Sequence, residues 1–378
     1  MTVLVTGGAG FIGTNFILRW LAAGGDKVVN LDKLTYAGNR HNLSGLSADR
    51  HELVQADIGD REAVDRLLAG RRPRAVVNFA AESHVDRSIH GPADFVETNV
   101  VGTFNLLESV RGYWGTLRGE EASGFRFLHV STDEVYGSLT PEAPAFTEDS
   151  PYAPNSPYSA TKAASDHLVR AYRHTYGLPT LTTNCSNNYG PYQFPEKLVP
   201  LMILNGLEGR PLPVYGDGRQ VRDWLHVHDH VRAIALVLER GRVGGTYNIG
   251  GRSEKSNLEV VLAVCRLLDE LAPDEKIGPR ERLVAFVADR PGHDRRYAVD
   301  FGLIASELGF EPSFDFVSGL RATVGWYLAN RPWVESVTSG GYRSWIDQNY
   351  GESRGAAARA GGDAGRPGGA DGEGGNVR

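Results

Sequence analysis

The stretch TVLVTGGAGFIG, residues 2–13, decides the fold. Its first five residues form a short apolar run, and Gly7, Gly10 and Gly13 follow at a regular spacing before a helical pattern. Glycine at these positions permits a tight turn, lets backbone N–H groups approach a pyrophosphate, and places the positive end of a helix beside it. The stretch therefore predicts the first strand, turn and helix of a dinucleotide-binding sheet.

The second expected strand, residues 27–31, ends in an acidic residue. Asp32 follows the glycine turn by about twenty residues, where a carboxylate accepts hydrogen bonds from the adenosine ribose. This favours NAD over NADP. The neighbouring Lys33 could instead face a 2′-phosphate, and NAD is our prediction.

Strand-like and helical patterns alternate along the N-terminal half. Further apolar runs lie at residues 52–55, 75–79, 125–130 and 180–185. The alternation predicts an α/β protein with a Rossmann-type, doubly wound parallel sheet and a smaller, mixed α/β C-terminal domain. The expected division is residues 1–185 for an NAD-binding domain, with the chain crossing between lobes afterwards, residues 186–350 mainly for the substrate, and residues 351–378 for a disordered glycine-rich tail.

Bulk composition excludes several classes of function. The 378 residues are 41% hydrophobic, and the net charge of −6 is spread over both signs. No basic stripe indicates nucleic acid, and no apolar run is long enough for a membrane span. Cys185 and Cys265 have no metal-type spacing. We expect a cytoplasmic protein that binds no metal, nucleic acid or membrane.

Tyr158 and Lys162 lie four residues apart at the start of a helical pattern, so they share one helix face. A lysine charge there would favour the tyrosine phenolate and lower its pKa toward working pH, which suits a base that removes a hydroxyl proton. The alternative is a solvated lysine beside a packed tyrosine.

An acidic pair, Asp133 and Glu134, follows Ser131 and Thr132 at the end of an expected strand. Adjacent carboxylates repel unless one holds a proton, which is the condition for one to act as acid and the other as base. The alternative is a solvated turn.

Other polar residues are less decisive. His84 and Arg87 follow the fourth expected strand, and Thr98 with Asn99 interrupts a mostly apolar helix; each is either ligand-facing or structural. Cations also recur in separate loops, where arginine forks would suit a diphosphate unless they are scattered surface charges. These cations are Lys197, Arg219, Arg222, Arg290, Arg295 and Arg296.

The chain from residue 1 to about 350 resembles the extended short-chain dehydrogenase/reductases that act on nucleotide sugars, and within them the dTDP-glucose 4,6-dehydratase family. The shared part is the glycine turn with Tyr158 and Lys162, and the discriminating part is STDEVYG, residues 131–137. Further matches are DKLTYAG (32–38), residues 80–87, residues 186–197, Arg222 to Trp224, Asn257 and DRPGHDRRY (289–297).

The resemblance implies three sets of site residues. The catalytic set is Thr132, Asp133, Glu134, Tyr158 and Lys162. The NAD-binding set is Gly7, Gly10, Phe11, Ile12, Gly13, Asp32, Lys33, Leu34, Thr35, Asp57, Ile58, Ala80, Ala81, Glu82, Ser83, Thr98, Tyr158, Lys162 and Asn187. The nucleotide-sugar set is Ser83, His84, Thr132, Asp133, Glu134, Asn187, Lys197, Leu198, Pro213, Val214, Tyr215, Arg222, Asn257, Asp289, Arg290, Pro291, Gly292, His293 and Tyr350.

The implied reaction is the dehydration of dTDP-glucose to dTDP-4-keto-6-deoxyglucose, for deoxysugar biosynthesis. Tyr158, aided by Lys162 and Thr132, serves the oxidation at carbon 4; Glu134 and Asp133 serve the elimination of water across carbons 5 and 6. The resemblance also implies a homodimer, paired through helices at residues 94–110 and 158–176. Two alternatives are a 4-epimerase, which needs no acid–base pair, and an NAD-binding protein without turnover. The pathway and the preference for thymidine over uridine stay open.

Overall fold

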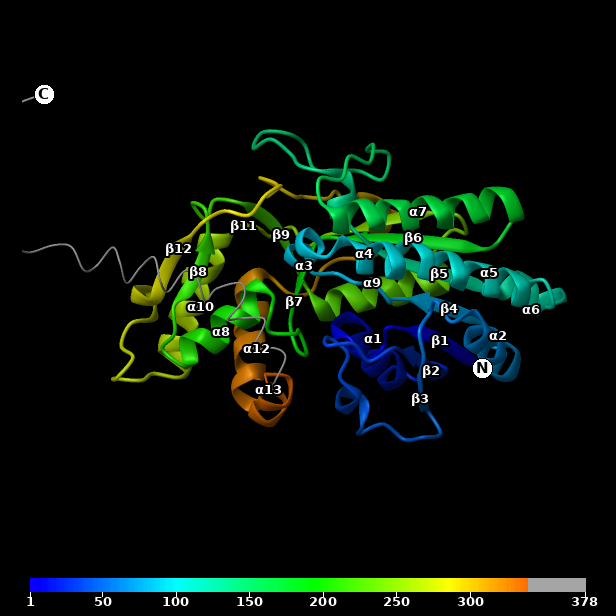
Figure 1. Cartoon of the computed structure of the whole chain (residues 1–378), viewed down its shortest axis with the longest axis horizontal. Helices are drawn as coiled ribbons and strands as arrows, with labels where there is room; N and C mark the ends of the chain where they lie inside the picture. The colour runs from blue at the N-terminus through cyan, green and yellow to red at the C-terminus, as the bar shows by residue number, and fades with distance from the viewer. Residues whose placement is uncertain (339–378) are drawn as a thin grey trace, which may run out of the picture. The chain divides into compact units, whose positions relative to one another are not determined.

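A parallel sheet organises the described part of the chain, residues 1–338 of the computed structural model (Figure 1). Its strands run in the order β10-β6-β5-β4-β1-β2-β3, and every neighbouring pair is parallel. The strands are β1 (Thr2–Thr6), β2 (Lys27–Asp32), β3 (His51–Gln55), β4 (Ala75–Asn78), β5 (Arg126–Thr132), β6 (Thr180–Cys185) and β10 (Thr246–Ile249). Because β1 pairs with both β2 and β4, the winding reverses beside β1, which confirms the predicted doubly wound sheet.

Successive side chains of a strand point to opposite faces, so the apolar run of β1 supplies two cores. Val3 and Val5 pack in one core, which includes residues of α1 (Phe11–Ala22) and α9 (Val227–Arg240). Leu4 packs in the other, which includes residues of α2 (Arg61–Arg71), α5 (Thr103–Trp114) and α7 (Pro157–Tyr176). Figure 1 shows α7 and α9 on opposite sides of β6.

Two expected elements differ from the structure. The strand expected at residues 125–130 is β5, which continues through Ser131 and Thr132, so both side chains stand at the carboxyl edge of the sheet. The helix expected at residues 94–110 is divided into α4 (Pro92–Phe95), the π-helical segment η2 (Val96–Gly102) and α5. Such π-helical segments are frequent at functional sites. Here Asn99, within η2, accepts a hydrogen bond from the Glu82 backbone and donates to its carbonyl oxygen.

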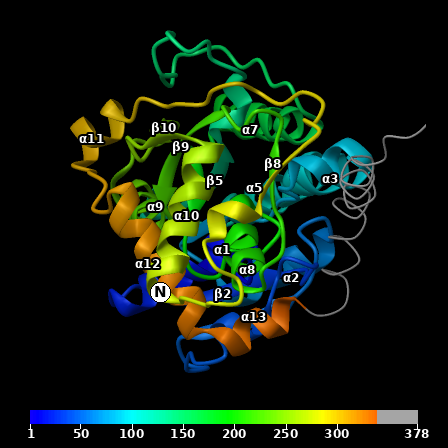
Figure 2. The same cartoon turned by 90° about the vertical axis from the view of Figure 1, so that its left-hand side faces the viewer.

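A smaller C-terminal lobe follows β6. A three-stranded sheet in the order β11-β9-β7 contains β7 (Asn187–Tyr189), β9 (Val221–His226) and β11 (Glu254–Ser256), and β8 (Leu212–Tyr215) pairs with β12 (Val284–Val287). Figure 2 shows three of its helices together, α8, α10 and α12. The helices of this part of the chain are α8 (Leu198–Leu207), α10 (Asn257–Leu271), α12 (Phe316–Ala329) and α13 (Arg331–Val337).

The chain returns to the large sheet within this region. Strand β10 belongs to the large sheet and helix α9 contacts β6 and β10. Helix α11 (Gly302–Leu308) also contacts β10. Residues Met1–Val337 group together as one unit, and the division at residue 185 stays a prediction. The expected tail lies outside the described residues. Within residues 1–338, no helix is long and apolar enough to cross a membrane.

The remaining short helices connect these elements. They are η1 (Arg40–Leu43), α3 (Val85–His90), α6 (Gly119–Gly124), η3 (Asp133–Tyr136) and η4 (Arg280–Leu283). Of these, η3 matters most for the site, because it begins directly after β5 and carries both carboxylates of the acidic pair.

Candidate active site

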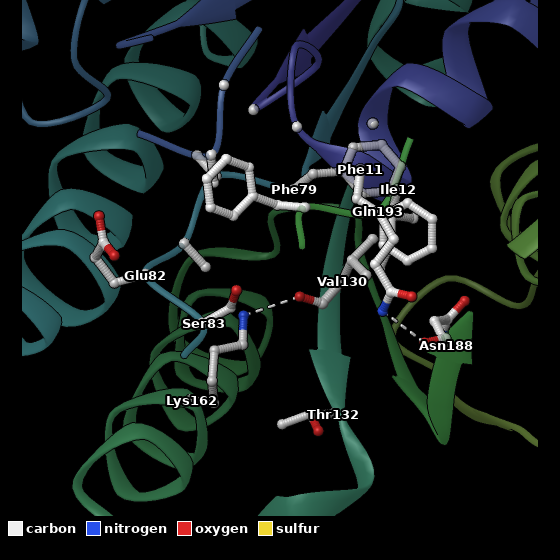
Figure 3. A pocket seen from close by; sticks show the side chains of 18 of the residues that line it. Phe11, Ile12, Phe79, Glu82, Ser83, Val130, Thr132, Lys162, Asn188 and Gln193 are labelled. Atoms are coloured by element: carbon white, nitrogen blue, oxygen red, sulfur yellow. Dashed lines mark hydrogen bonds between the residues drawn. The ribbon is translucent and has the colours of Figure 1, made fainter. Parts of the chain in front are cut away.

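A cavity of about 350 Å³ lies at the carboxyl edge of the large sheet, where ligands bind in folds of this kind. The glycine turn, the ends of β2, β4, β5 and β6, and the start of α7 all contribute to its lining. Figure 3 shows this pocket, with Lys162 of α7 pointing toward Val130 of β5.

The predicted cofactor residues gather around this cavity. All of them line it except Leu34, whose backbone N–H instead donates to Asp32. The lining members are Gly7, Gly10, Phe11, Ile12, Gly13, Asp32, Lys33, Thr35, Asp57, Ile58, Ala80, Ala81, Glu82, Ser83, Thr98, Tyr158, Lys162 and Asn187.

The glycine turn is closely packed. Gly7 has a φ of +66°, and a Cβ on it would lie 2.7 Å from the Ala80 backbone nitrogen. A Cβ on Gly13 would lie 2.3 Å from the Gly7 carbonyl oxygen. Because these neighbours are backbone atoms, the turn leaves no room for side chains. A turn of this kind at the start of a helix suits the binding of a phosphate group.

Asp32 ties the end of β2 to the glycine turn. Its carboxylate accepts hydrogen bonds from Ala9 N at 2.8 Å and Leu34 N at 2.7 Å. Burial raises its pKa, and these two bonds oppose the shift. Lys33 forms an ion pair with Asp57 at 2.7 Å, so a carboxylate already engages the cation that could have faced a 2′-phosphate.

Tyr158 and Lys162 are both buried at the start of α7. The helix begins at Pro157 behind a capping box formed by Ser156 and Ser159, which fixes its entry into the cavity. Lys162 Nζ donates to Val130 O at 2.9 Å. The shared helix face is as predicted, and the alternative of a solvated lysine is wrong because this side chain is only 3% exposed.

The predicted lowering of the Tyr158 pKa is wrong. Burial raises it well above its usual value, and the neighbouring Glu134 charge adds to the rise, while a hydrogen bond to Thr132 opposes it. A lysine four residues away does not outweigh the loss of water around the phenol. Burial of the phenol therefore opposes its deprotonation.

Asp133 and Glu134 differ in their surroundings, as the acid–base interpretation requires. Burial, and then the neighbouring Glu134, raise the Asp133 pKa well above its usual value. Burial also raises the Glu134 pKa, but Arg290, Lys197 and Arg222 oppose that rise. Asp133 therefore favours the protonated form, whereas nearby cations favour the Glu134 carboxylate.

The local contacts of the pair agree with this division. Thr132 Oγ1 caps η3 by accepting from Glu134 N at 3.3 Å, and lies 3.3 Å from Asp133 Oδ1. Asp133 Oδ2 is buried without a hydrogen-bond partner among the described residues. Both carboxyl groups line the cavity together with Tyr158, so the alternative of a solvated turn is wrong.

The six loop cations divide into two groups. Lys197, Arg222 and Arg290 act on the Glu134 charge, as expected for convergence on one site. Arg219 and Arg295 instead pair with Asp217, and Arg296 pairs with Glu254. Convergence is therefore confined to three of the six.

The predicted nucleotide-sugar residues are only partly brought to the cavity. Ser83, Thr132, Asp133, Glu134, Asn187, Lys197 and Leu198 line it. Those that do not line it are His84, Pro213, Val214, Tyr215, Arg222, Asn257, Asp289, Arg290, Pro291, Gly292 and His293. Tyr350 lies outside the described residues.

Asp86 connects several of the residues outside the lining. Arg290 pairs with it at 2.8 Å, and Tyr215 Oη donates to it at 3.2 Å. His293 Nδ1 lies 2.6 Å from Asp289 Oδ1. Because Arg290 also acts on Glu134, this second group of residues is near the acidic pair.

Sequence reasoning missed part of the lining. Glu196 is buried, accepts from Tyr36 Oη at 3.2 Å and pairs with Arg87 at 3.2 Å, and the Arg87 guanidinium lies 3.7 Å from the centre of the Tyr36 ring. Its position in a polar loop after β6 was the available signal. Other lining residues belong to the matching stretches 186–197 and 222–224 but were assigned no site role: Ser186, Asn188, Gln193, Phe194 and Trp224.

A protein-family model identifies the class of protein to which the chain belongs. The family model described as GDP-mannose 4,6 dehydratase matches residues 4–323, and the chain belongs to this family. The expected membership among nucleotide-sugar dehydratases and the Rossmann-type fold are confirmed.

Individual relatives of high sequence identity carry the name dTDP-glucose 4,6-dehydratase. The chain is 62% identical over 343 residues to the dTDP-glucose 4,6-dehydratase of Xanthomonas campestris pv. campestris, covering 90% of this chain and 97% of that protein. It is 58% identical over 359 residues to dTDP-glucose 4,6-dehydratase 1 of Escherichia coli, covering 93% and 99%. The Streptomyces venezuelae dTDP-glucose 4,6-dehydratase, solved with NAD bound, is 50% identical with a TM-score of 0.80, over 89% of this chain and all of that one.

Proposed function

We propose that this protein is an NAD-dependent dTDP-glucose 4,6-dehydratase, a hydro-lyase that forms dTDP-4-keto-6-deoxyglucose. The observation that carries the proposal is the presence of Tyr158, Lys162, Asp133 and Glu134 in one cavity. Burial raises the pKa of both carboxyl groups, and three nearby cations oppose the rise at Glu134. High identity to relatives of that name supports the proposal.

The cofactor site fits NAD. The tight glycine turn leaves backbone N–H groups for a pyrophosphate, and Asp32 stands at the end of β2 beside the turn. The remaining parts of the cofactor would contact Phe11, Ile12 and the other lining residues of the predicted NAD-binding set. NAD, when bound, accepts the hydride from carbon 4 and returns it later to carbon 6.

The protein residues move the protons. Tyr158 takes the proton of the 4-hydroxyl, with Lys162 and Thr132 favouring its deprotonated form. The resulting 4-ketone acidifies carbon 5, whose proton Glu134 removes. Asp133 then protonates the departing 6-hydroxyl, and a water molecule leaves. A proton finally returns to carbon 5 when hydride reaches carbon 6, so one water is lost and no net oxidation occurs.

The same site argues against a 4-epimerase. That reaction needs the oxidation step but no elimination, so it has no use for two adjacent carboxyl groups in the cavity beside Tyr158. Incubation with dTDP-glucose should produce the alkali-induced absorbance of a 4-keto-6-deoxy sugar. Its absence, together with formation of dTDP-galactose, would favour the epimerase. Comparing turnover of dTDP-glucose and UDP-glucose tests the choice of base, because one methyl group contributes about 1–3 kcal/mol of discrimination.

Three variants separate the two stages of the reaction. Tyr158→Phe should block NADH formation. Glu134→Gln should still reduce bound NAD but slow exchange of the carbon 5 proton with deuterium by about a hundredfold or more. Asp133→Asn should slow water loss while exchange continues. Glu142→Gln, at an exposed carboxylate, is the control. Equal loss of NADH formation in Tyr158→Phe and Glu134→Gln would contradict the assigned roles.

The remaining expectations belong to the same proposal. We place the nucleotide-sugar residues, including Arg222, Asn257, residues 289–293 and Tyr350, mainly in the 186–350 domain and the NAD site in the 1–185 domain. We also place the enzyme in the cytoplasm. For assembly we propose a homodimer formed through α5 and α7, because Phe104 and Tyr176 on these helices are 42% and 48% exposed. Light scattering that gives a monomer at micromolar concentration would overturn the dimer.

A further inference from the structure

A buried carboxylate lies behind Lys162 and takes no part in the steps described above. Asp166 follows Lys162 by four residues on α7, so the two side chains share a helix face. Asp166 is 5% exposed and Lys162 is 3% exposed. A buried charge is costly unless another charge or hydrogen bonds compensate for it, so this arrangement requires an explanation.

Asp166 is held by hydroxyl donors. Ser131 Oγ donates to Asp166 Oδ2 at 2.8 Å, and Tyr152 Oη donates to the same oxygen at 3.0 Å. The Tyr152 oxygen itself accepts from Asn184 Nδ2 at 3.0 Å, which directs its proton toward Asp166. Asp166 Oδ2 therefore accepts two hydrogen bonds from buried or partly buried hydroxyl groups.

His129 lies between the lysine and this carboxylate. Its Nε2 is 3.4 Å from Lys162 Nζ and also 3.4 Å from Asp166 Oδ1. Burial, and then the Lys162 charge, lower the His129 pKa to about 4. His129 is therefore uncharged near neutral pH and does not itself balance a charge on Asp166.

Several titratable groups surround Lys162. They are Tyr158 and Asp166 on α7, His129 on β5, Cys185 on β6, and Asp133 and Glu134 on η3. Burial lowers the Lys162 pKa, and Asp166 is the strongest of the charges that oppose this fall. Without such a charge, a fully buried lysine tends to lose its proton.

We propose that Asp166, acting across the neutral ring of His129, is the counter-ion that keeps Lys162 protonated. Asp166 is thus a positioning residue for the Tyr158–Lys162 pair. This inference rests on the proposed function only in its catalytic consequence. A neutral Lys162 would no longer favour the Tyr158 phenolate, so loss of the Asp166 charge should impair oxidation most at high pH.

The direct test is the titration of Lys162 by NMR in protein labelled with [¹³Cε]lysine, with the Lys162 signal assigned by its absence in Lys162→Met. Wild-type Lys162 should keep its ammonium signal at pH 8. In Asp166→Asn, which preserves shape but removes the charge, its midpoint should fall by at least about one pH unit, a tenfold change in proton affinity. An unchanged midpoint would overturn the proposal.

Matched variants separate charge from structure. Ser131→Ala and Tyr152→Phe remove hydrogen bonds to Asp166 but keep the carboxyl group, so the Lys162 midpoint should stay near the wild-type value. Asp166→Glu also keeps a carboxyl group, so its Lys162 midpoint should lie closer to wild type than that of Asp166→Asn. Glu108→Gln, which removes another carboxylate that accepts from a tyrosine, should have no effect. If Asp166→Asn does not fold, a wild-type Lys162 that is already neutral at pH 8 still overturns the proposal, and an ammonium signal there supports it.

A kinetic readout connects the charge to catalysis. In single-turnover NADH formation, the loss of rate at high pH should begin at least about one pH unit lower in Asp166→Asn than in wild type. The NMR midpoint does not depend on turnover. A shifted Lys162 midpoint in a protein that does not form NADH would therefore contradict the proposed function and support this inference. An unshifted midpoint in a protein that does form NADH would contradict this inference alone.

Discussion

The cofactor half and the substrate half of the site are built in different ways. The cofactor half comes from the glycine turn and the ends of neighbouring parallel strands, and all but one of its predicted residues line a single cavity. The substrate half draws on segments far apart in the sequence, from Tyr215 to His293, and many of its predicted residues lie outside that lining.

Different interactions hold the two halves. Strand register places the cofactor residues, because parallel strands end at one edge of the sheet. Ion pairs and side-chain hydrogen bonds place the substrate residues, as in the contacts of Asp86 with Arg290 and Tyr215. Substitutions in the cofactor half should therefore change cofactor binding by displacing the backbone. Substitutions in the substrate half should change substrate affinity by altering charge.

The largest effect is expected in the cofactor half. A Cβ in Gly13→Ala would lie 2.3 Å from the Gly7 carbonyl oxygen, so the turn must shift. Overpacking of this kind costs about 1–3 kcal/mol, and at the upper end NAD affinity should fall by about a hundredfold. Calorimetric titration of the cofactor-free protein measures this. Gly45→Ala, where the added Cβ meets no atom within 4 Å, is the control, and equal affinities in the two variants would contradict the account.

A smaller, selective effect is expected in the substrate half. Arg290→Gln removes the partner of Asp86 and a cation that acts on Glu134. Arg290 is 23% exposed, so solvent screens its charge and reduces the binding free energy that is lost with it. We expect a loss of about 1–2 kcal/mol, which corresponds to about a tenfold rise in KM for dTDP-glucose. The NAD content should not change. Loss of NAD in this variant would show that the two halves are not independent.

The Asp86–Arg290 pair also predicts a dependence on pH. Burial would raise the Asp86 pKa, but Arg290 and other partners lower it below the usual value. A lowered folded-state pKa gives stability that is present above the unfolded value of about 3.9 and lost as pH falls through the folded value. Unfolding midpoints in denaturant should therefore converge for wild type and Arg290→Gln below about pH 3.9. A difference that persists at lower pH would mean that Arg290 stabilises the fold without this charge.

A weak effect is expected for Lys33→Gln. The Lys33–Asp57 pair is 58% and 37% exposed, and surface pairs contribute about 0–1 kcal/mol. NAD affinity, measured by the same titration, should change by less than about fivefold. A larger loss of NAD affinity would mean that Lys33 contacts the cofactor directly. If Lys33→Gln instead gained NADP binding, the Lys33–Asp57 pair would not be the reason that a 2′-phosphate is disfavoured.

The smallest effect is expected for Arg219→Gln. Arg219 is 76% exposed and its ion pair with Asp217 is long, at 3.9 Å. Turnover and KM should stay within about twofold of wild type. A rise in KM comparable to that of Arg290→Gln would mean that Arg219 also contacts the substrate.

The features that depend on local spacing could be predicted from the amino-acid sequence. The glycine turn, the strand that ends at Asp32, the shared face of Tyr158 and Lys162 and the position of the acidic pair were all predictable. Each follows from a short-range rule: glycines at every third position, side chains four residues apart on a helix, or a polar residue directly after an apolar strand. The resemblance to nucleotide-sugar dehydratases rests on the same local motifs.

The electrostatics of the site could not be predicted from the sequence, because they arise from the folded arrangement of its residues. The Tyr158 pKa rises although Lys162 is near, because burial outweighs one neighbouring charge. Arg290 acts on the acidic pair while Arg219 does not, although both are arginines in loops. His129 and Asp166 carry no motif, yet β5 and α7 bring them together behind Lys162. The physical reason is that desolvation and Coulomb interactions depend on distances between residues remote in sequence, which periodicity and spacing do not encode.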